Sequence, residues 1–310
     1  MKKRFLSILT ALCLCLTLLP TAVLAEDGRL AEPDEALAAS NGTDVAYLTL
    51  AGKFVIKSYH DTLEDAITAA IALSDREKAD VDITINEQVK TINVTGEPEI
   101  YSAHKITLNL QGCAVSGTIC VGSTDGTQKG TLEIKDNQTF GGRGSIENVA
   151  VHSGSSLTLD GTVQTGIGTI SHDTNASITL LSGNIGAINS GTPDYTTYLG
   201  TERAYYAYDS GTKGSILTIA EVEARLQNDK AVAVAPCEHS KGTLSGRDFT
   251  CAYCCKEIKN NDVVLTETDG MMTLYTADKL SDALSSAQSR SGCTVELLTD
   301  IKSGTPFTIT

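Results

Sequence analysis

The sequence has no tryptophan and is poor in positively charged residues. Its 24 Lys and Arg residues stand against 38 Asp and Glu residues, which gives a formal net charge of −14 at pH 7. Because such an acidic surface repels phosphate groups and anionic lipid headgroups, the composition argues against nucleic acid as a partner. Long hydrophobic runs are also scarce, since only one is present and it lies at the N-terminus.

The N-terminal run has the organisation of a secretory signal peptide over residues 1–25. Three basic residues (Lys2, Lys3 and Arg4) precede an apolar stretch that is shorter than the roughly 18 to 20 residues of a membrane-spanning helix, and a Val-x-Ala pattern ends it. Cleavage would remove these three cations and change the net charge from −14 to −17. We therefore expect a secreted or cell-surface protein, held at a membrane only through an anchor not visible in this sequence. Residues 26–44 are acidic and Ala-rich and are expected to form a flexible leader.

The cysteines are too irregularly spaced to build the fold by themselves. Cleavage of the signal peptide would leave seven of them: Cys113, Cys120, Cys237, Cys251, Cys254, Cys255 and Cys293. The number is odd, and the paired spacings of a small secreted disulfide scaffold occur only near residues 237–255. The core is therefore expected to come from side-chain packing.

An internal repeat is the most informative feature of the sequence. Residues 45–70 and 263–287 each read as strand, glycine turn, strand and helix. Five identities at fixed spacing relate the copies: Asp61, Leu63, Asp65, Ala66 and Ala70 correspond to Asp278, Leu280, Asp282, Ala283 and Ala287. The repeat predicts a hairpin plus capping helix over residues 45–80 and the start of a second, truncated module over residues 259–310. Because the second copy stops within a predicted strand, we expect the chain to be part of a longer protein.

The helix of the first copy is predicted to be amphipathic. Its apolar residues recur at helical spacing on one face (Leu63, Ala66, Ile67, Ala70 and Ile71). Asp61 is expected to cap the helix, with Glu64 as its capping-box partner. Such a helix can cover the end of a stack of strands, whose last edge would otherwise pair with other chains.

Short β-strands recur between the two copies, over residues 81–235. The separations of 25 residues from Leu132 to Leu157 and of 21 residues from Leu157 to Ile178 match one coil of a parallel β-solenoid, and roughly four to five coils fit. The alternative, an antiparallel sandwich, would show turns every 8 to 12 residues. In the solenoid, four apolar pairs would point inward (Ile106/Leu108, Leu132/Ile134, Leu157/Leu159 and Ile178/Leu180), with Thr107, Glu133, Thr158 and Thr179 outward.

These features together resemble a known family. The hairpin, the D-x-L-x-D-A helix and strand repeats such as ITLNLQG and SGNI resemble the right-handed β-helix repeat modules of large exported, adhesin-like surface proteins of Gram-positive bacteria, and the helix is similar to the cap of pectate-lyase-like proteins. The resemblance covers about residues 45–310. It implies a mainly β fold, a right-handed parallel β-helix with an N-terminal hairpin and capping helix, and the start of a second such module at the C-terminus. It also implies a rigid stalk or adhesive scaffold, with host or cell-wall glycans or surface proteins as partners.

The outward positions do not predict an active site. β-Helix lyases and hydrolases need paired carboxylates from adjacent coils, or an acidic calcium site beside an Arg or Lys base. The equivalent outward positions here are Asn109, Lys135, Asp160 and Leu181, and the Asn-Thr-Asp and Gly-His-Gly patterns of galacturonases do not occur. We expect a non-enzymatic protein without catalytic residues. The alternative is a carbohydrate-active β-helix enzyme, a polysaccharide lyase or glycoside hydrolase, which would gather several outward charged side chains on adjacent coils.

Half of the ten tyrosines fall within a predicted insertion at residues 192–210. They are Tyr195, Tyr198, Tyr205, Tyr206 and Tyr208. Their rings and hydroxyl groups could contact a sugar or a protein partner, or they could cover the last coil. The absence of tryptophan favours the covering role.

Residues 236–258 form a Cys/His-rich junction before the second copy. Cys237, His239, Cys251 and Cys254 offer a Cys₃His set that suits one closed, structural zinc site. A disulfide between the two halves, or no bond at all, is the alternative, since an exported chain permits either. The resemblance to surface modules implies glycine after the last cysteine of such a set, whereas this sequence has Cys255, which could serve as a substitute ligand or be a redox liability. No other cofactor is predicted.

Overall fold

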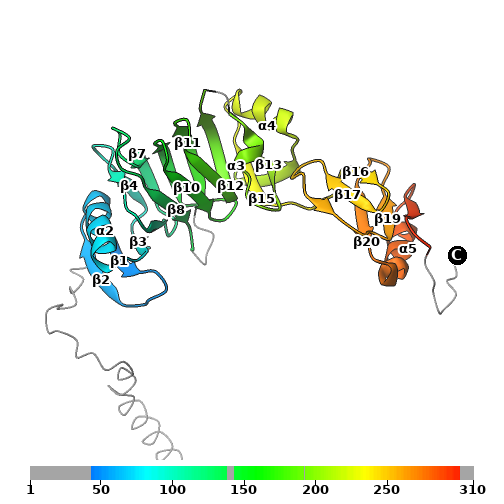
Figure 1. Cartoon of the computed structure of the whole chain (residues 1–310), viewed down its shortest axis with the longest axis horizontal. Coiled ribbons are helices and arrows are strands. Elements are labelled where there is room, and N and C mark those ends of the chain that lie inside the picture. Colours follow the sequence, from blue (N-terminus) through cyan, green and yellow to red (C-terminus); the bar gives the residue numbers. More distant parts are fainter. Residues whose placement is uncertain (1–42, 138–142, 192, 301–310) are drawn as a thin grey trace, which may run out of the picture. The chain divides into compact units, whose positions relative to one another are not determined.

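A computed structural model describes residues 43–137, 143–191 and 193–300 of the chain. The signal peptide predicted for residues 1–25 lies outside these residues, as does most of the acidic leader. The described part begins with a hairpin of strands β1 (Ala46–Leu50) and β2 (Ile56–His60), then helix α2 (Leu63–Glu77) and strand β3 (Val81–Ile85) (Figure 1). β1 pairs in antiparallel orientation with both β2 and β3, and α2 packs on this sheet.

Helix α2 is capped by Thr62, so the predicted cap at Asp61 was wrong by one residue. The Thr62 backbone is extended, and its side-chain oxygen accepts a hydrogen bond from the backbone N–H of Asp65 at 3.1 Å. Glu64 does not complete a capping box with Asp61 but accepts a hydrogen bond from the backbone N–H of Thr95 at 2.8 Å. Thr and Asp are both good cap residues, so adjacent candidates are not separated by propensity. The predicted apolar face is buried at Leu63, Ala66, Ile67 and Ala70 and half-buried at Ile71.

The middle of the chain is a parallel β-solenoid of about four turns, which confirms the predicted fold class. Its further strands are β4 (Thr91–Asn93), β5 (Glu99–Ile100), β6 (Lys105–Asn109), β7 (Ala114–Val121), β8 (Thr131–Lys135), β9 (Ser145–Val151), β10 (Ser156–Asp160), β11 (Gly166–His172) and β12 (Ser177–Asn189). One sheet stacks β3, β6, β8, β10 and the first half of β12. The other stacks β4, β7, β9, β11 and the second half of β12, and β5 also pairs with β7. The parallel pairing rules out the antiparallel sandwich.

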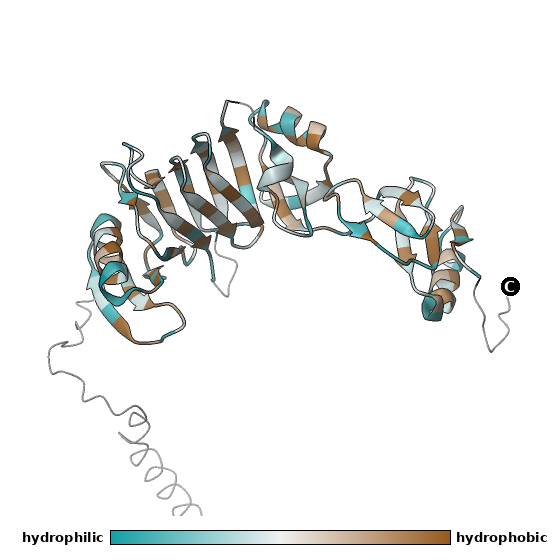
Figure 2. Cartoon of the chain, in the orientation of Figure 1, coloured by the Kyte–Doolittle hydropathy of each residue, from teal (hydrophilic) through white to brown (hydrophobic). Residues whose placement is uncertain are grey.

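The residues predicted to point inward form two continuous rows through the solenoid. Ile106, Leu132, Leu157 and Ile178 lie opposite one another in successive strands, and Leu108, Ile134, Leu159 and Leu180 form the second row. All eight are at most 4 % exposed, and Figure 2 shows hydrophobic residues following one another across these strands. The outward row of Thr107, Glu133, Thr158 and Thr179 is also in register. A β-bulge after Leu159 pairs Asp160 with Ser182, so Ser182 takes the outward place expected for Leu181.

Short elements close the C-terminal end of the solenoid. They are α3 (Tyr195–Tyr198), β13 (Arg203–Asp209), β14 (Thr212–Ile216), α4 (Ile219–Leu226) and β15 (Val232–Pro236). β15 runs antiparallel to β12 and pairs on its other side with β13. Beyond β12 the parallel stacking continues only as an isolated bridge between Leu180 and Leu199 within the described residues, and β15 covers the edge of β12 over Gly183 to Ile185.

A small antiparallel sheet follows and contains β16 (Gly242–Ser245), β17 (Asp248–Cys251) and β18 (Glu257–Ile258). We call residues 237–258 the ribbon. Gly242 lies opposite Cys251, and a Cβ atom at Gly242 would stand only 2.1 Å from the backbone oxygen of Thr250. The ribbon strands can therefore approach this closely only with glycine at that position.

The last described elements repeat the topology of the first. β19 (Val263–Thr266) pairs in antiparallel orientation with β20 (Met272–Tyr275) and β21 (Thr294–Leu297), as β1 does with β2 and β3. Between β20 and β21 lie η1 (Ala277–Lys279) and α5 (Leu280–Gln288). Leu280 and Ala283 are buried like their counterparts in α2. In the described residues, none of the helices has the length and apolar character needed to cross a membrane.

Candidate metal centre

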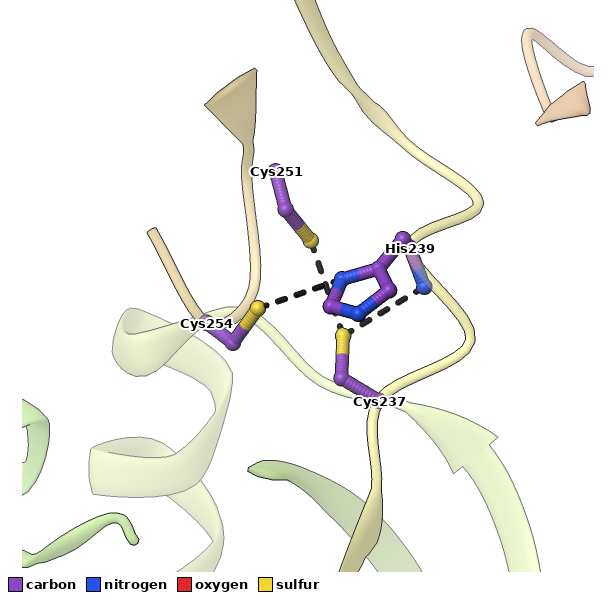
Figure 3. Close-up of side chains that lie close together, drawn as sticks. All are labelled: Cys237, His239, Cys251 and Cys254. Carbon is purple, nitrogen blue, oxygen red and sulfur yellow. Dashed lines mark hydrogen bonds between the residues drawn. The ribbon is translucent and has the colours of Figure 1, made fainter. Parts of the chain in front are cut away.

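Two turns bring the four predicted ligands together. Cys237 and His239 follow directly after β15, whereas Cys251 ends β17 and Cys254 lies in the turn toward β18. In Figure 3 the three sulfur atoms and the imidazole ring point toward one common centre. The four ligand atoms all lie within 4.8 Å of one another.

The spacing of the ligand atoms fits a tetrahedral zinc ion. The Cys237 and Cys251 sulfur atoms are 3.5 Å apart, and His239 Nδ1 is 3.3 Å from the Cys254 sulfur. Zinc–sulfur bonds of about 2.3 Å in a tetrahedron place ligand sulfurs roughly 3.8 Å apart, whereas a disulfide joins them at about 2.05 Å. A disulfide would also leave the histidine without a role. The donor set and its spacing therefore favour the metal over the disulfide.

Backbone groups prepare the sulfur atoms for negative charge. The backbone N–H of His239 donates to the Cys237 sulfur and that of Tyr253 donates to the Cys251 sulfur, both at 3.4 Å. The turn itself is closed by a hydrogen bond from the Cys255 N–H to the Cys251 oxygen at 3.1 Å. N–H groups aimed at sulfur stabilise the thiolate form, which is the form that binds metal.

The centre is embedded in a small hydrophobic cluster. Cys251 is 1 % exposed and Cys237 is 9 % exposed, and Phe249, Tyr253 and Tyr206 pack around them. Phe249 and Cys251 lie two residues apart on β17 and so share one face of the strand. The sequence analysis missed these aromatic side chains, because the single alternation of Phe249 and Cys251 in a four-residue strand is too short to predict them.

Burial controls the protonation of the ligands. Burial raises the pKa of Cys237 and Cys254, and burial together with nearby Lys256 lowers the pKa of His239. In the absence of a cation, burial therefore disfavours the charged forms of these two thiols and of the imidazole. A divalent cation reverses the preference of the thiols, because it stabilises the thiolates and releases their protons.

Cys255 does not join the four ligands. It is exposed, and its backbone φ of 56° is the left-handed conformation that favours glycine. The expectation of glycine after the last ligand thus has a conformational reason, which the cysteine meets with strain. The geometry offers Cys255 no place as a substitute ligand.

The five clustered tyrosines lie mostly in the interior. Tyr195, Tyr198, Tyr205 and Tyr206 are each at most 7 % exposed, and Tyr208 is half-buried. The Tyr205 hydroxyl donates to the Tyr195 backbone oxygen at 3.0 Å, and the Tyr206 hydroxyl donates to that of Pro236 at 2.7 Å. Burial of four rings leaves Tyr208 as the member of the group with surface open to a ligand.

One group of outward charges lies on adjacent coils of the solenoid. Glu133 on β8 forms ion pairs with Lys105 on β6 at 2.6 Å and with Lys135 at 3.2 Å, and its side chain is 10 % exposed. Burial works to raise the pKa of Glu133, but hydrogen bonds and charge from the two lysines outweigh it and lower the pKa. A carboxylate held in this way is a weak base, which suits a clamp between coils better than proton transfer.

No protein-family model, no curated protein and no solved structure matches this chain.

Proposed function

We propose that this chain is an exported structural protein, a rigid β-solenoid scaffold of the adhesin-like kind, in which Cys237, His239, Cys251 and Cys254 hold one structural zinc ion. The observation that carries the proposal is the convergence of these four ligand atoms within 4.8 Å, from two separate turns whose first cysteines, Cys237 and Cys251, are 14 residues apart in the sequence. A full set of four protein ligands leaves no open position for a substrate. The metal therefore supplies stability rather than catalysis.

The size of the ribbon explains why it needs a metal. Its strands have only two to four residues each, and segments below about 40 residues cannot bury enough apolar surface to fold alone. The cluster around the centre joins Ala204 and Ala233 of β13 and β15 to Phe249 of the ribbon. On the other side, the Met272 N–H donates to the Ser240 backbone oxygen at 2.6 Å. A metal here would brace the junction between the solenoid and the second copy.

Metal content tests this role directly. Residues 26–310, purified anaerobically without chelator, should contain one zinc ion per chain by mass spectrometry. Cys251→Ser should lose the zinc and part of the thermal stability, because a buried ligand is missing. Cys255→Gly is the matched control and should keep the zinc, because Cys255 is not one of the four ligands. Its stability should match or exceed that of the original protein, because glycine adopts the left-handed backbone conformation at this position without strain.

Two other results would contradict the zinc centre. Absence of metal with protected thiols would identify a disulfide clasp. Absence of metal with freely reactive thiols, and no loss of stability in Cys251→Ser, would remove the brace from the proposal altogether.

A carbohydrate-active enzyme is the second candidate, favoured by the charges at Lys105, Glu133 and Lys135. These are the outward charged side chains on adjacent coils that an enzyme requires. However, the Glu133 carboxylate is already paired with Lys105 and Lys135. The next outward positions in the same row, Thr158 and Thr179, are uncharged. The scaffold is therefore the better supported function.

A further inference from the structure

The first hairpin has an open face opposite helix α2. Along β1, Ala46, Leu48 and Leu50 are buried, so the residues between them lie on the other face. There Tyr47 pairs with Tyr59 across the hairpin, and Thr49 pairs with Ile56. All four are only half-buried.

The second hairpin shows what happens to the same face when it is covered. Its corresponding pairs are Val264 with Leu274 and Thr266 with Met272. Val264 is fully buried, and Leu274 and Met272 pack against the hydrophobic cluster of the ribbon that contains Phe249. In the second copy this face is thus mostly apolar and partly covered, with Thr266, Met272 and Leu274 half-buried.

The first copy carries tyrosines where the second has Val264 and Leu274. A tyrosine ring keeps a large apolar face but adds a hydroxyl group, which suits a surface that stays in contact with water. The segment before β1, residues 26–44, contains no cysteine, histidine or aromatic residue from which a second ribbon could be built. The composition of the face therefore suits contact with water and with polar groups rather than the docking of a second ribbon.

A hollow of about 330 Å³ lies on this face. Tyr47, Tyr59 and Ile56 form its apolar wall, with the two ring centroids 6.1 Å apart and the rings tilted by 55°. Asn86, Glu87 and Gln111 line the polar side. The volume is at the lower end of the range for small-molecule pockets, which corresponds to one or two sugar rings.

The polar side chains decide the chemistry of the ligand. Within the described part of the chain, the Glu87 carboxylate and the Gln111 amide have no hydrogen-bond partner, whereas the Asn86 side chain is already bonded to Asp44 and Gln88. An ionised carboxylate only accepts hydrogen bonds, and an amide both donates and accepts. A sugar hydroxyl can serve both, and the C–H face of a sugar ring can lie on a tyrosine ring. An anionic ligand would be repelled by the Glu87 carboxylate, and a purely apolar one would gain no hydrogen bond from either side chain.

We propose that the open face of the first hairpin binds a neutral saccharide, with Tyr47 and Tyr59 as the stacking platform and Glu87 and Gln111 as the hydrogen-bonding groups. The site lies on elements other than the metal centre. Loss of zinc by Cys251→Ser therefore leaves the binding test intact.

Tyrosine signals provide the test, since residues 26–310 contain ten tyrosines and no tryptophan. Ring-¹³C-tyrosine protein is titrated in turn with tetrasaccharides of glucose, N-acetylglucosamine, galactose and mannose, each to about 10 mM, a range that detects weak affinity. The signals of Tyr47 and Tyr59, assigned by their loss in single variants, should shift with at least one sugar while the other eight stay in place.

The second copy supplies the variant that keeps the fold. Tyr47→Val with Tyr59→Leu recreates the Val264/Leu274 pair on the same topology and should lower saccharide affinity at least tenfold, measured on the backbone signals of Glu87 and Gln111. Tyr101→Ala, outside the hollow, is the control and should leave the affinity unchanged. No shift at Tyr47 and Tyr59 with any of the four sugars overturns the proposal. The proposal is also overturned if the Tyr47 and Tyr59 signals change with protein concentration and not with sugar, because the face would then bind other copies of the protein.

Discussion

At the scale of the residue, Glu133 shows how an outward charge can serve stability. Its carboxylate is bound by Lys105 and Lys135, whose side chains are 38 % and 32 % exposed. Glu133→Gln keeps the shape but removes the charge, so we expect a loss of about 1 kcal/mol at pH 7, discounted for the exposure of the lysines. Asp160→Asn, an outward carboxylate on the next coil, should change the free energy of unfolding by less than about 0.5 kcal/mol.

The pH dependence of that loss follows from the lowered pKa of Glu133. A carboxyl group whose pKa is lower in the folded state stabilises the protein above its unfolded pKa of about 4.3. This contribution disappears as the pH falls through the folded pKa. Urea unfolding should therefore separate the original protein from Glu133→Gln at pH 7, and the difference should shrink progressively as the pH falls below about 4.3. A difference that stays the same over this range would mean that the lysines do not act through the charge. If the original protein cleaves a polysaccharide and Glu133→Gln does not, the carbohydrate-active enzyme becomes the better supported function.

At the scale of the element, the inward rows should carry most of the stability of the solenoid. Leu132 is fully buried between Ile106 and Leu157 of the neighbouring strands. Leu132→Ala leaves a cavity in a stack that cannot collapse around it, so we expect a loss of about 3 kcal/mol in chemical denaturation. Thr158→Ala, outward on the next strand, should cost well under 1 kcal/mol. Similar losses for both variants would show that the rows are not the core.

The strands of the solenoid could be predicted because each coil repeats the same alternation. Leu132 and Leu157 stand one coil apart, and their spacing alone fixed the register later seen in the pairing. The bulge after Leu159 escaped prediction, because one extra residue shifts the pairing of Asp160 without changing the pattern around it. The ribbon strands also escaped, since runs of two to four residues carry no period. In the ribbon, the spacing of the cysteines and the histidine predicted the four grouped ligands. It did not predict that Phe249, Tyr253 and Tyr206 would pack around them.

At the scale of the whole molecule, the solenoid and the ribbon should differ in how they respond to loss of metal. Each coil contacts only its neighbours, so a local change need not spread along the stack. With the proposed zinc ion bound, in contrast, the ribbon would depend on a centre whose binding energy exists only in the folded state. Met272 and Leu274 of β20 pack against that same cluster. Chelation should therefore loosen the ribbon together with the β19–β20 hairpin.

Hydrogen exchange can separate these responses. After zinc is removed by a chelator under reducing conditions, amides of β17, β18 and β20 should exchange at least about tenfold faster, while those of β6, β8 and β10 keep their protection. The zinc-loaded Cys255→Gly protein should match the untreated chain throughout. Faster exchange in β6, β8 and β10 as well would mean that the centre holds a single cooperative unit with the solenoid. Unchanged exchange in β17 and β18 would mean that packing alone holds the ribbon, and it would contradict the proposed metal brace.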